Sequence, residues 1–340
     1  MDNDAVSAHL ASALSDRFRI ERELDGGGMS RIFVATEHAL QREVVIKVVP
    51  QEMLEGLSAA RFAREVLFAA RLQQANIVPV LASGSSDDLS WYSMPFVRGE
   101  SLRVRLERGE RIAVGEGIGI LRDIARALAF AHAEGVVHRD IKPENVLLSG
   151  GTAVVTDFGI AKAIHIARTA ELPTNPDLLG RTGSTTQTGF AKGTPAYMSP
   201  EQAAGDEFVD HRSDLYSWGI VAWELFSGRH PFGERKTQRA LFVAHVAEMP
   251  VPIQNIRPDV PPALATLIAH CLEKDPTRRP RSAAAVLDAL DGLNTPIGSA
   301  VVTSGTDGGP ARGGPPIAVI GALVALTCLA ALAYWTMSAN

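Results

Sequence analysis

Two short polar motifs constrain this 340-residue chain most, HRDIKPENVLL at His138–Leu148 and VVTDFGIAK at Val154–Lys162. Asp140 and Asn145 stand five residues apart in the first motif, and Asp157 opens the triplet DFG in the second. Transfer of a phosphoryl group needs a carboxylate that accepts the proton of the attacking hydroxyl, and oxygen ligands for the metal ions on the phosphates. The two motifs contain both, so they predict phosphoryl transfer.

Both motifs resemble the catalytic loop and the metal-binding motif of protein kinases. The resemblance implies that Asp140 is the catalytic base and that Asn145 and Asp157 bind Mg²⁺, with Mn²⁺ as an alternative ion. It also implies that Lys142 supports the transferred phosphate. Lysine at this position is typical of the serine/threonine branch of the family. A buried strand–loop–strand with solvated charges is the alternative, and two motifs at this separation argue against it.

The composition is that of a globular protein, with 46% hydrophobic and 21% charged residues. A net charge of −5 argues against a nucleic-acid partner, because such proteins normally carry a basic face. The two cysteines are far apart in the sequence, which argues against a disulfide framework and for a reducing compartment. The N-terminus contains acidic residues and no long apolar run, so we expect no signal peptide and a cytoplasmic catalytic domain.

Residues 18–97 are predicted to form a small β-rich lobe. The stretch Phe18–Glu37 has the pattern strand, glycine-rich turn, strand, and Glu43–Pro50 is a third apolar strand. A glycine-rich hairpin lets backbone N–H groups approach phosphates, because no side chain blocks them. Within the resemblance, Lys47 corresponds to the lysine that holds the α- and β-phosphates of ATP, and Glu65 to the helix glutamate that pairs with it.

The glycine loop departs from the kinase pattern, because Asp25 stands at the first glycine position. Its carboxylate would lie near the triphosphate and weaken nucleotide binding through like-charge repulsion. Residues 95–97 are expected to form the hinge that faces the adenine edge. The ATP site implied by the resemblance consists of Leu24, Gly26, Gly27, Gly28, Ile32, Val45, Lys47, Met94, Pro95, Val97 and Leu147.

A long polar segment, residues 160–192, follows the second motif. It is either a disordered surface loop or an activation loop that becomes ordered when it is phosphorylated. Arg139 favours the activation loop, because kinases with arginine before the base usually hold it against a loop phosphate. We expect autophosphorylation, which a homodimer can carry out in trans. The candidate hydroxyls are Thr182, Ser184, Thr185, Thr186 and Thr188.

Residues 98–290 are predicted to form a large helical lobe, which makes the expected fold α+β and bilobal, as in protein kinases. GTPAYMSPEQA at 193–203 resembles the segment that docks protein substrate, and its Thr194 would bridge the catalytic base and Lys142. Four further residues are implied to be structural. Glu201 would pair with Arg279, Asp214 would bind the catalytic-loop backbone, and His138 would pack against the DFG phenylalanine. His132 is interpreted as a core histidine rather than a catalyst.

The ends of the chain are predicted to lie outside the catalytic domain. Residues 1–17 form a tail or a short amphipathic helix, and residues 291–316 form a flexible tether rich in Gly, Pro, Ser and Thr. Residues 317–335 contain no charge and would span ~28 Å as a helix, close to the thickness of a bilayer core. We therefore expect a single-pass membrane protein, with a cytoplasmic kinase and residues 336–340 outside. The resemblance to bacterial kinases implies that this membrane is the bacterial inner membrane.

The sequence thus resembles a bacterial serine/threonine protein kinase that phosphorylates proteins with Mg-ATP in membrane-linked signalling. Two alternatives stay open. A membrane-tethered scaffold without catalysis is supported by Asp25 alone. A kinase of small molecules on the same fold is less consistent with the docking segment and the hydroxyl-rich loop.

Overall fold

The computed structural model divides the chain into two units, Met1–Pro296 and Ile297–Asn340. The second unit, with the predicted membrane span, lies outside the described residues, and so does most of the tether. Among the described residues, no helix is long and apolar enough to cross a bilayer. The structure describes residues 10–24, 31–50, 59–86, 89–158, 195–206, 208–235 and 237–293.

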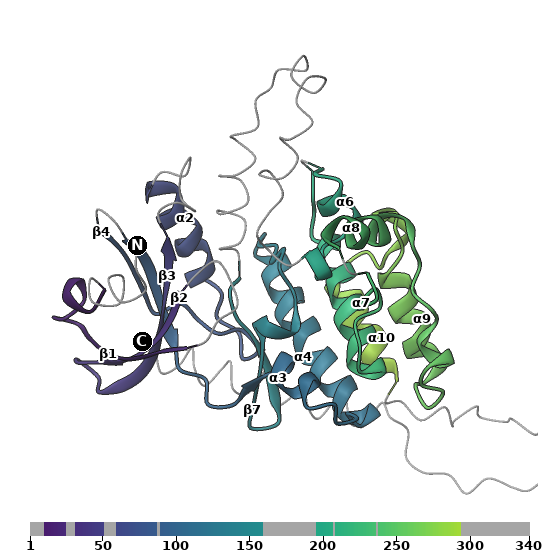
Figure 1. Cartoon of the computed structure of the whole chain (residues 1–340), viewed down its shortest axis with the longest axis horizontal. Coiled ribbons are helices and arrows are strands. Elements are labelled where there is room, and N and C mark those ends of the chain that lie inside the picture. Colours follow the sequence, from purple (N-terminus) through teal and green to yellow (C-terminus); the bar gives the residue numbers. More distant parts are fainter. Residues whose placement is uncertain are drawn as a thin grey trace, which may run out of the picture. The chain divides into compact units, whose positions relative to one another are not determined.

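The N-terminal lobe is built on an antiparallel five-stranded sheet in the order β1-β2-β3-β5-β4 (Figure 1). Apolar residues dominate β2 and β3, and in β3 most of them are β-branched, which favours a strand. Their buried side chains form much of the lobe's core. The strands predicted at 18–37 and 43–50 are confirmed. The strand bounds are β1 Phe18–Leu24, β2 Arg31–Glu37, β3 Arg42–Pro50, β4 Ala82–Ser86 and β5 Leu89–Pro95.

The apolar stretch from Ile77 predicts a further strand, but this strand, β4, begins only at Ala82. Pro79 provides no backbone N–H for a ladder hydrogen bond. Instead, the Val78 N–H donates to the Val155 carbonyl at 2.9 Å, so this segment bonds to the C-terminal lobe. The segment therefore connects the two lobes close to the DFG motif.

Two elements pack beside the sheet. Helix α2 (Ala59–Ala70) carries Glu65 and packs Val66 and Ala69 inward. Leu10 and Leu14, from the segment predicted as an N-terminal tail, are buried with Phe18 and Trp91. The described part of that segment thus covers an apolar face of the sheet, and burial of these side chains stabilises it there.

The C-terminal lobe is helical, as predicted. In Figure 1, α4, α7 and α10 lie together, and α9 packs on α7 and α10. The periodicity of the sequence predicts helices in 101–108, 115–135, 214–225, 263–280 and 282–293, and each of these ranges contains a helix. The helix bounds are α3 Leu102–Glu107, α4 Val114–Ala133, α6 Pro200–Ala203, α7 Arg212–Ser227, α8 Gln238–Ala247, α9 Pro262–Cys271 and α10 Ala283–Gly292.

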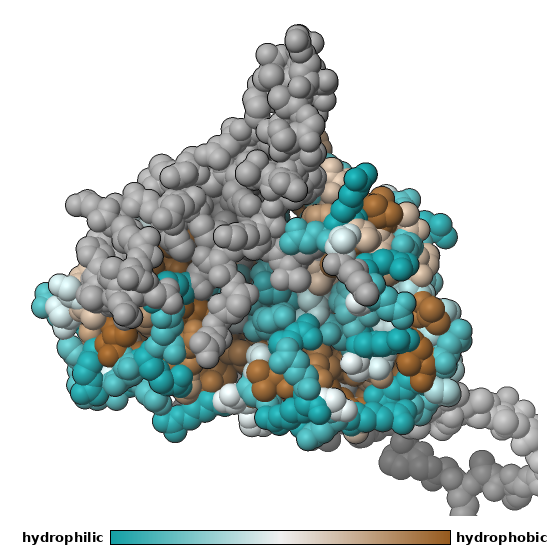
Figure 2. Space-filling view, viewed as in Figure 1, coloured by the Kyte–Doolittle hydropathy of each residue, from teal (hydrophilic) through white to brown (hydrophobic). Residues whose placement is uncertain are grey.

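Helix α7 runs through the centre of this lobe, with side chains buried along nearly its whole length. It approaches α4 at Gly117, where a Cβ would come within 2.6 Å of Leu225 and Phe226 side-chain atoms. Trp218 on α7 donates its indole N–H to the Leu121 carbonyl on α4 at 3.0 Å. The apolar residues are therefore inside, and hydrophilic residues cover much of the described surface in Figure 2.

A small antiparallel sheet, β6-β7-β8, positions the catalytic motifs. Its strands are β6 Glu100–Ser101, β7 Val146–Ser149 and β8 Thr152–Val155. The catalytic loop ends where β7 begins, and the DFG motif follows β8. Because β7 and β8 pair directly, the two motifs are held side by side.

Candidate active site

The catalytic loop holds its polar groups close together. Lys142 Nζ donates to Asp140 Oδ2 at 2.7 Å, and Asn145 Nδ2 donates to the Asp140 backbone carbonyl at 2.8 Å and to Oδ2 at 3.1 Å. A 3₁₀ turn at Pro143–Asn145 brings Asn145 back toward Asp140. The predicted base therefore lies beside the side-chain cation of Lys142.

The DFG aspartate is held from the N-terminal lobe. Lys47 Nζ on β3 donates to Asp157 Oδ2 at 2.7 Å, and Tyr92 Oη on β5 donates to Asp157 Oδ1 at 2.7 Å. Burial alone would raise the pKa of Asp157, but the charge of Lys47 and these hydrogen bonds hold it below its usual value. Asp157 is therefore kept ionised, as a metal ligand must be.

Asp157 and Arg139 share an unusual backbone conformation. Their φ angles are +69° and +67°, in the left-handed region that side chains other than glycine disfavour. Such strain persists only where surrounding contacts impose it, and it concentrates at functional sites. Both residues are next to the predicted chemistry.

Buried hydrogen bonds hold the two motifs in register. His138 Nε2 lies 2.9 Å from the Thr156 carbonyl, and the His138 ring packs edge-on against Phe158 with centroids 4.6 Å apart. The Thr156 N–H donates to the Asn145 carbonyl at 3.0 Å. His138 thus has the structural position that the sequence predicted.

Asp214 on α7 fixes the start of the catalytic loop. It is fully buried and accepts the backbone N–H groups of His138 at 2.8 Å and Arg139 at 2.7 Å. His132 Nε2 lies 2.8 Å from the same carboxylate, so this histidine is a structural core residue. Burial would raise the pKa of Asp214, but His132 and the backbone donors lower it below its ordinary value.

The predicted adenine-lining residues meet in one apolar cluster between the lobes. Val45 and Met94 are buried there, and Ile32, Val97 and Leu147 are partly buried against them. Behind them is a small cavity, which the DFG motif closes on one side. It is lined by Ala69, Val78, Val80, Tyr92, Met94, Thr156, Asp157 and Phe158.

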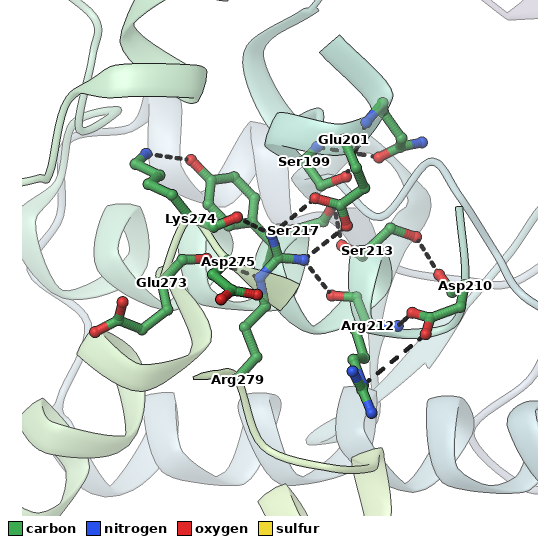
Figure 3. A network of polar contacts seen from close by, with 12 residues as sticks. Ser199, Glu201, Asp210, Arg212, Ser213, Ser217, Glu273, Lys274, Asp275 and Arg279 are labelled. Carbon is green, nitrogen blue, oxygen red and sulfur yellow. Dashed lines mark hydrogen bonds and ion pairs between the residues drawn. The ribbon is translucent and has the colours of Figure 1, made fainter. Parts of the chain in front are cut away.

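The docking segment is fastened to the helical lobe by the Glu201–Arg279 pair (Figure 3). Arg279 Nη1 and Nη2 donate to the two Glu201 carboxylate oxygens at 2.7 and 2.8 Å. Arg279 also donates to the carbonyls of Arg212, Glu273 and Lys274. Arg279 is therefore a buried guanidinium with all of its nitrogens hydrogen-bonded, and it pairs with Glu201 as the sequence predicted.

A comparison with protein families matches the protein kinase domain over residues 18–289. The chain belongs to the protein kinase family. It is 34% identical to a probable serine/threonine-protein kinase of Clostridium acetobutylicum over 286 residues, which are 84% of this chain and 41% of that protein.

Two mycobacterial relatives give a similar result. Identity to serine/threonine-protein kinase PknB of Mycolicibacterium smegmatis is 38%, over 80% of this chain and 42% of that protein. Identity to serine/threonine-protein kinase PknA of Mycobacterium tuberculosis is 35%, over 84% of this chain and 63% of that protein. The chain thus spans about two fifths to three fifths of the length of these three relatives.

The kinase domain contains a polar cluster that sequence reasoning missed. Arg103 on α3 pairs with Glu144 in the catalytic loop at 2.9 Å and with Glu224 on α7 at 2.9 Å. Arg103 and Glu224 also share hydrogen bonds with the Tyr197 hydroxyl in the docking segment. A glutamate within the apolar run of α7 was the sequence signal, because a buried carboxylate needs a partner.

Several predicted site residues lie outside the described part of this kinase. They are Gly26, Gly27 and Gly28 of the glycine loop, Thr194, and the loop hydroxyls Thr182, Ser184, Thr185, Thr186 and Thr188. Glu65 lies on α2, but its side chain is not described, so its pair with Lys47 stays a prediction. Leu24 is paired with Ile32 across β1 and β2, and Pro95 ends β5 at the hinge.

Proposed function

We propose that this chain is an ATP-dependent protein kinase that transfers the γ-phosphoryl group of ATP to serine or threonine hydroxyls of proteins. The observation that carries the proposal is that Asp140, Lys142 and Asn145 contact one another in a loop that is hydrogen-bonded to the DFG motif through Thr156. The aspartate of that motif, Asp157, is in turn held by Lys47. Membership of the kinase family and the serine/threonine-protein kinases among its relatives support it.

In this proposal the reaction is an in-line displacement. The substrate hydroxyl oxygen forms a bond to the γ-phosphorus while the bond from phosphorus to the β,γ-bridging oxygen breaks, and ADP leaves. Asp140 orients the hydroxyl and accepts its proton. Lys142 lies 2.7 Å from Asp140 and neutralises charge on the transferred group. Lys47 would hold the α- and β-phosphates.

Asn145 and Asp157 would hold Mg²⁺, which neutralises the charge that develops on the phosphates. Asp157 is ionised, and Asn145 uses its Nδ2 for both bonds to Asp140, so neither bond engages its amide oxygen. Among the described residues, no three His, Cys, Asp or Glu side chains form a metal cluster. A magnesium ion in a kinase does not need such a cluster, because phosphates and waters complete its six oxygen ligands.

We infer that activity depends on autophosphorylation of the loop between Thr182 and Thr188. Arg139 supports this inference, because its buried Nε has no hydrogen-bond partner in the described part of the chain, and its Nη2 donates only to a carbonyl, that of Val209 at 3.1 Å. A guanidinium in this state suits a phosphate, which accepts two parallel hydrogen bonds. A second copy of the kinase can deliver the phosphate in trans.

The proposed test uses the full chain incubated with Mg²⁺, ATP and a generic protein substrate, with Asp157→Asn as the inactive control. We expect phosphate on substrate and on residues 182–188 with the native chain alone, measured by intact mass and site mapping. Nucleotide binding without phosphate transfer would favour the scaffold alternative. Turnover of a metabolite without protein phosphorylation would favour the small-molecule kinase.

We further propose that residues 317–335 anchor the kinase in a bilayer, with the catalytic domain on the cytoplasmic side. The uncharged run of 19 residues supports this proposal, together with Tyr334 and Trp335 at its end. The full chain is expected in the membrane fraction after an alkaline wash, and a chain that ends at residue 316 in the supernatant. Equal release of both chains would refute the anchor.

A further inference from the structure

Tyr92 has no role in the catalytic scheme above, yet its hydroxyl contacts the predicted metal ligand. The register of β3 and β5 places Tyr92 directly opposite Lys47. Directly opposed residues project to the same face of a sheet, so both side chains reach the same place. There the Tyr92 hydroxyl donates to Asp157 Oδ1 and Lys47 Nζ donates to Asp157 Oδ2, each at 2.7 Å.

The tyrosine hydroxyl is not needed for packing alone. Tyr92 is 1% exposed within an apolar cluster that contains Val45 and Met94, a setting that a phenylalanine would fill equally well. Placing an O–H group there is unfavourable unless it has a hydrogen-bond partner. The partner is a carboxylate 65 residues away in the chain, at the predicted metal site.

The two donors do not prevent Asp157 from binding a metal. A carboxylate has about four lone-pair sites on its two oxygens, and the two hydrogen bonds occupy two of them. One donor on each oxygen restricts rotation of the carboxylate plane, which fixes the direction of the remaining lone pairs. Lys47 would be shared with the phosphates once ATP binds, whereas Tyr92 would keep its single bond.

We propose that Tyr92 is a positioning residue that holds Asp157 in the orientation in which it binds Mg²⁺. The proposal rests on the function proposed above, in which Asp157 is a magnesium ligand. Hydrogen-bond partners of metal-binding carboxylates typically contribute 10- to 100-fold to metal affinity. Tyr92 would thus act on magnesium binding rather than on the nucleotide itself.

The test compares Tyr92→Phe with the native full chain, and uses Tyr216→Phe as a matched control. Tyr216 is another buried tyrosine, and its hydroxyl lies 3.1 Å from His245 Nδ1, away from the active site. Binding of fluorescent ADP is measured without metal and then during titration with Mg²⁺. We expect Tyr92→Phe to bind metal-free ADP within about twofold of the native chain and to need about tenfold more Mg²⁺ for half-maximal effect.

Three outcomes would overturn the proposal. They are an unchanged Mg²⁺ requirement, a lower one, which would mean that the hydroxyl competes with the metal, and an equal increase in the Tyr216→Phe control. If the native chain shows no Mg²⁺-dependent binding of nucleotide at all, the proposed function fails instead. The two failures are therefore distinguishable without any measurement of activity.

A second measurement does not depend on the folding of a variant. The chain contains four tyrosines, so ring-labelled native protein should give few NMR signals. Addition of Mg²⁺ to the ADP complex should shift the Tyr92 ring signals and leave those of Tyr216 in place. A Tyr92 signal that does not respond to Mg²⁺ would contradict the proposal.

Discussion

Two of the ion pairs that connect distant parts of the kinase domain, Glu201–Arg279 and Lys47–Asp157, differ in their surroundings. Glu201–Arg279 is bidentate, with side chains 10% and 0% exposed, and three carbonyls complete the guanidinium's hydrogen bonds. Lys47–Asp157 has a single contact, with side chains 16% and 15% exposed. The first pair is saturated and structural, whereas the second retains capacity for phosphates and metal.

The largest effect should come from a change in the Lys47–Asp157 pair, and it should fall on the rate of phosphoryl transfer. Asp157→Asn keeps the shape of the side chain and its contact with Lys47 but removes the charge. We expect phosphoryl transfer to fall on the order of 10³-fold, because the charge on the phosphates is then poorly compensated. The urea midpoint should stay close to native. A large loss of stability with little loss of rate would reverse the comparison.

The saturated pair should respond in the opposite way. Arg279→Met leaves Glu201 as a buried carboxylate without its partner, and we expect unfolding free energy to fall by about 3 kcal/mol. Urea unfolding measures this change. The fraction that remains folded should still bind Mg-ADP with native affinity, and a specific loss of nucleotide binding would show that the pair also serves the active site.

A buried histidine on α8, His245, sharpens the comparison, because no carboxylate in the described part of the chain forms an ion pair with it. Burial, with the charges of His230 and Lys274, lowers the pKa of His245 to about 3. The Tyr216 hydroxyl lies 3.1 Å from Nδ1 of the His245 ring. The folded protein therefore holds this histidine neutral, whereas the unfolded chain protonates it below about pH 6.5. Stability should fall as pH falls from 6.5 toward 3.

His245→Gln removes that titration. We expect the loss of unfolding free energy between pH 6.5 and 5 to become smaller by about 1 kcal/mol per pH unit, as measured by urea unfolding at each pH. An unchanged pH dependence would mean that His245 binds its proton equally well in the folded and unfolded protein, which would contradict the lowered pKa. The equivalent change at His38, an exposed histidine, serves as the control.

The smallest effect should come from an exposed ion pair. Arg19 lies 2.9 Å from Glu21 on β1, with side chains 70% and 38% exposed. Solvent and salt screen such a pair, so Arg19→Ala should change stability by less than about 0.5 kcal/mol. A larger change in thermal unfolding would show that contact distance, rather than burial, decides the contribution of ion pairs in this protein.

The sequence by itself determined the features that depend on local spacing. The catalytic loop holds Asp140, Lys142 and Asn145 within six consecutive residues, so their spacing in the sequence already brings them close together. The apolar run from Val44 to Val49 likewise predicted the strand that carries Lys47. The resemblance to kinases supplied the distant pair of Glu201 and Arg279, which spacing alone does not reveal.

The tertiary structure decided which distant side chains meet. Nothing near Tyr92 in the sequence indicates a contact with Asp157, because that contact depends on the register of β3 and β5 and on the packing of one lobe against the other. Arg103 meets Glu224 for the same reason. Such contacts arise when a fold buries polar groups that must find partners, and the nearest partner in space is often far away along the chain.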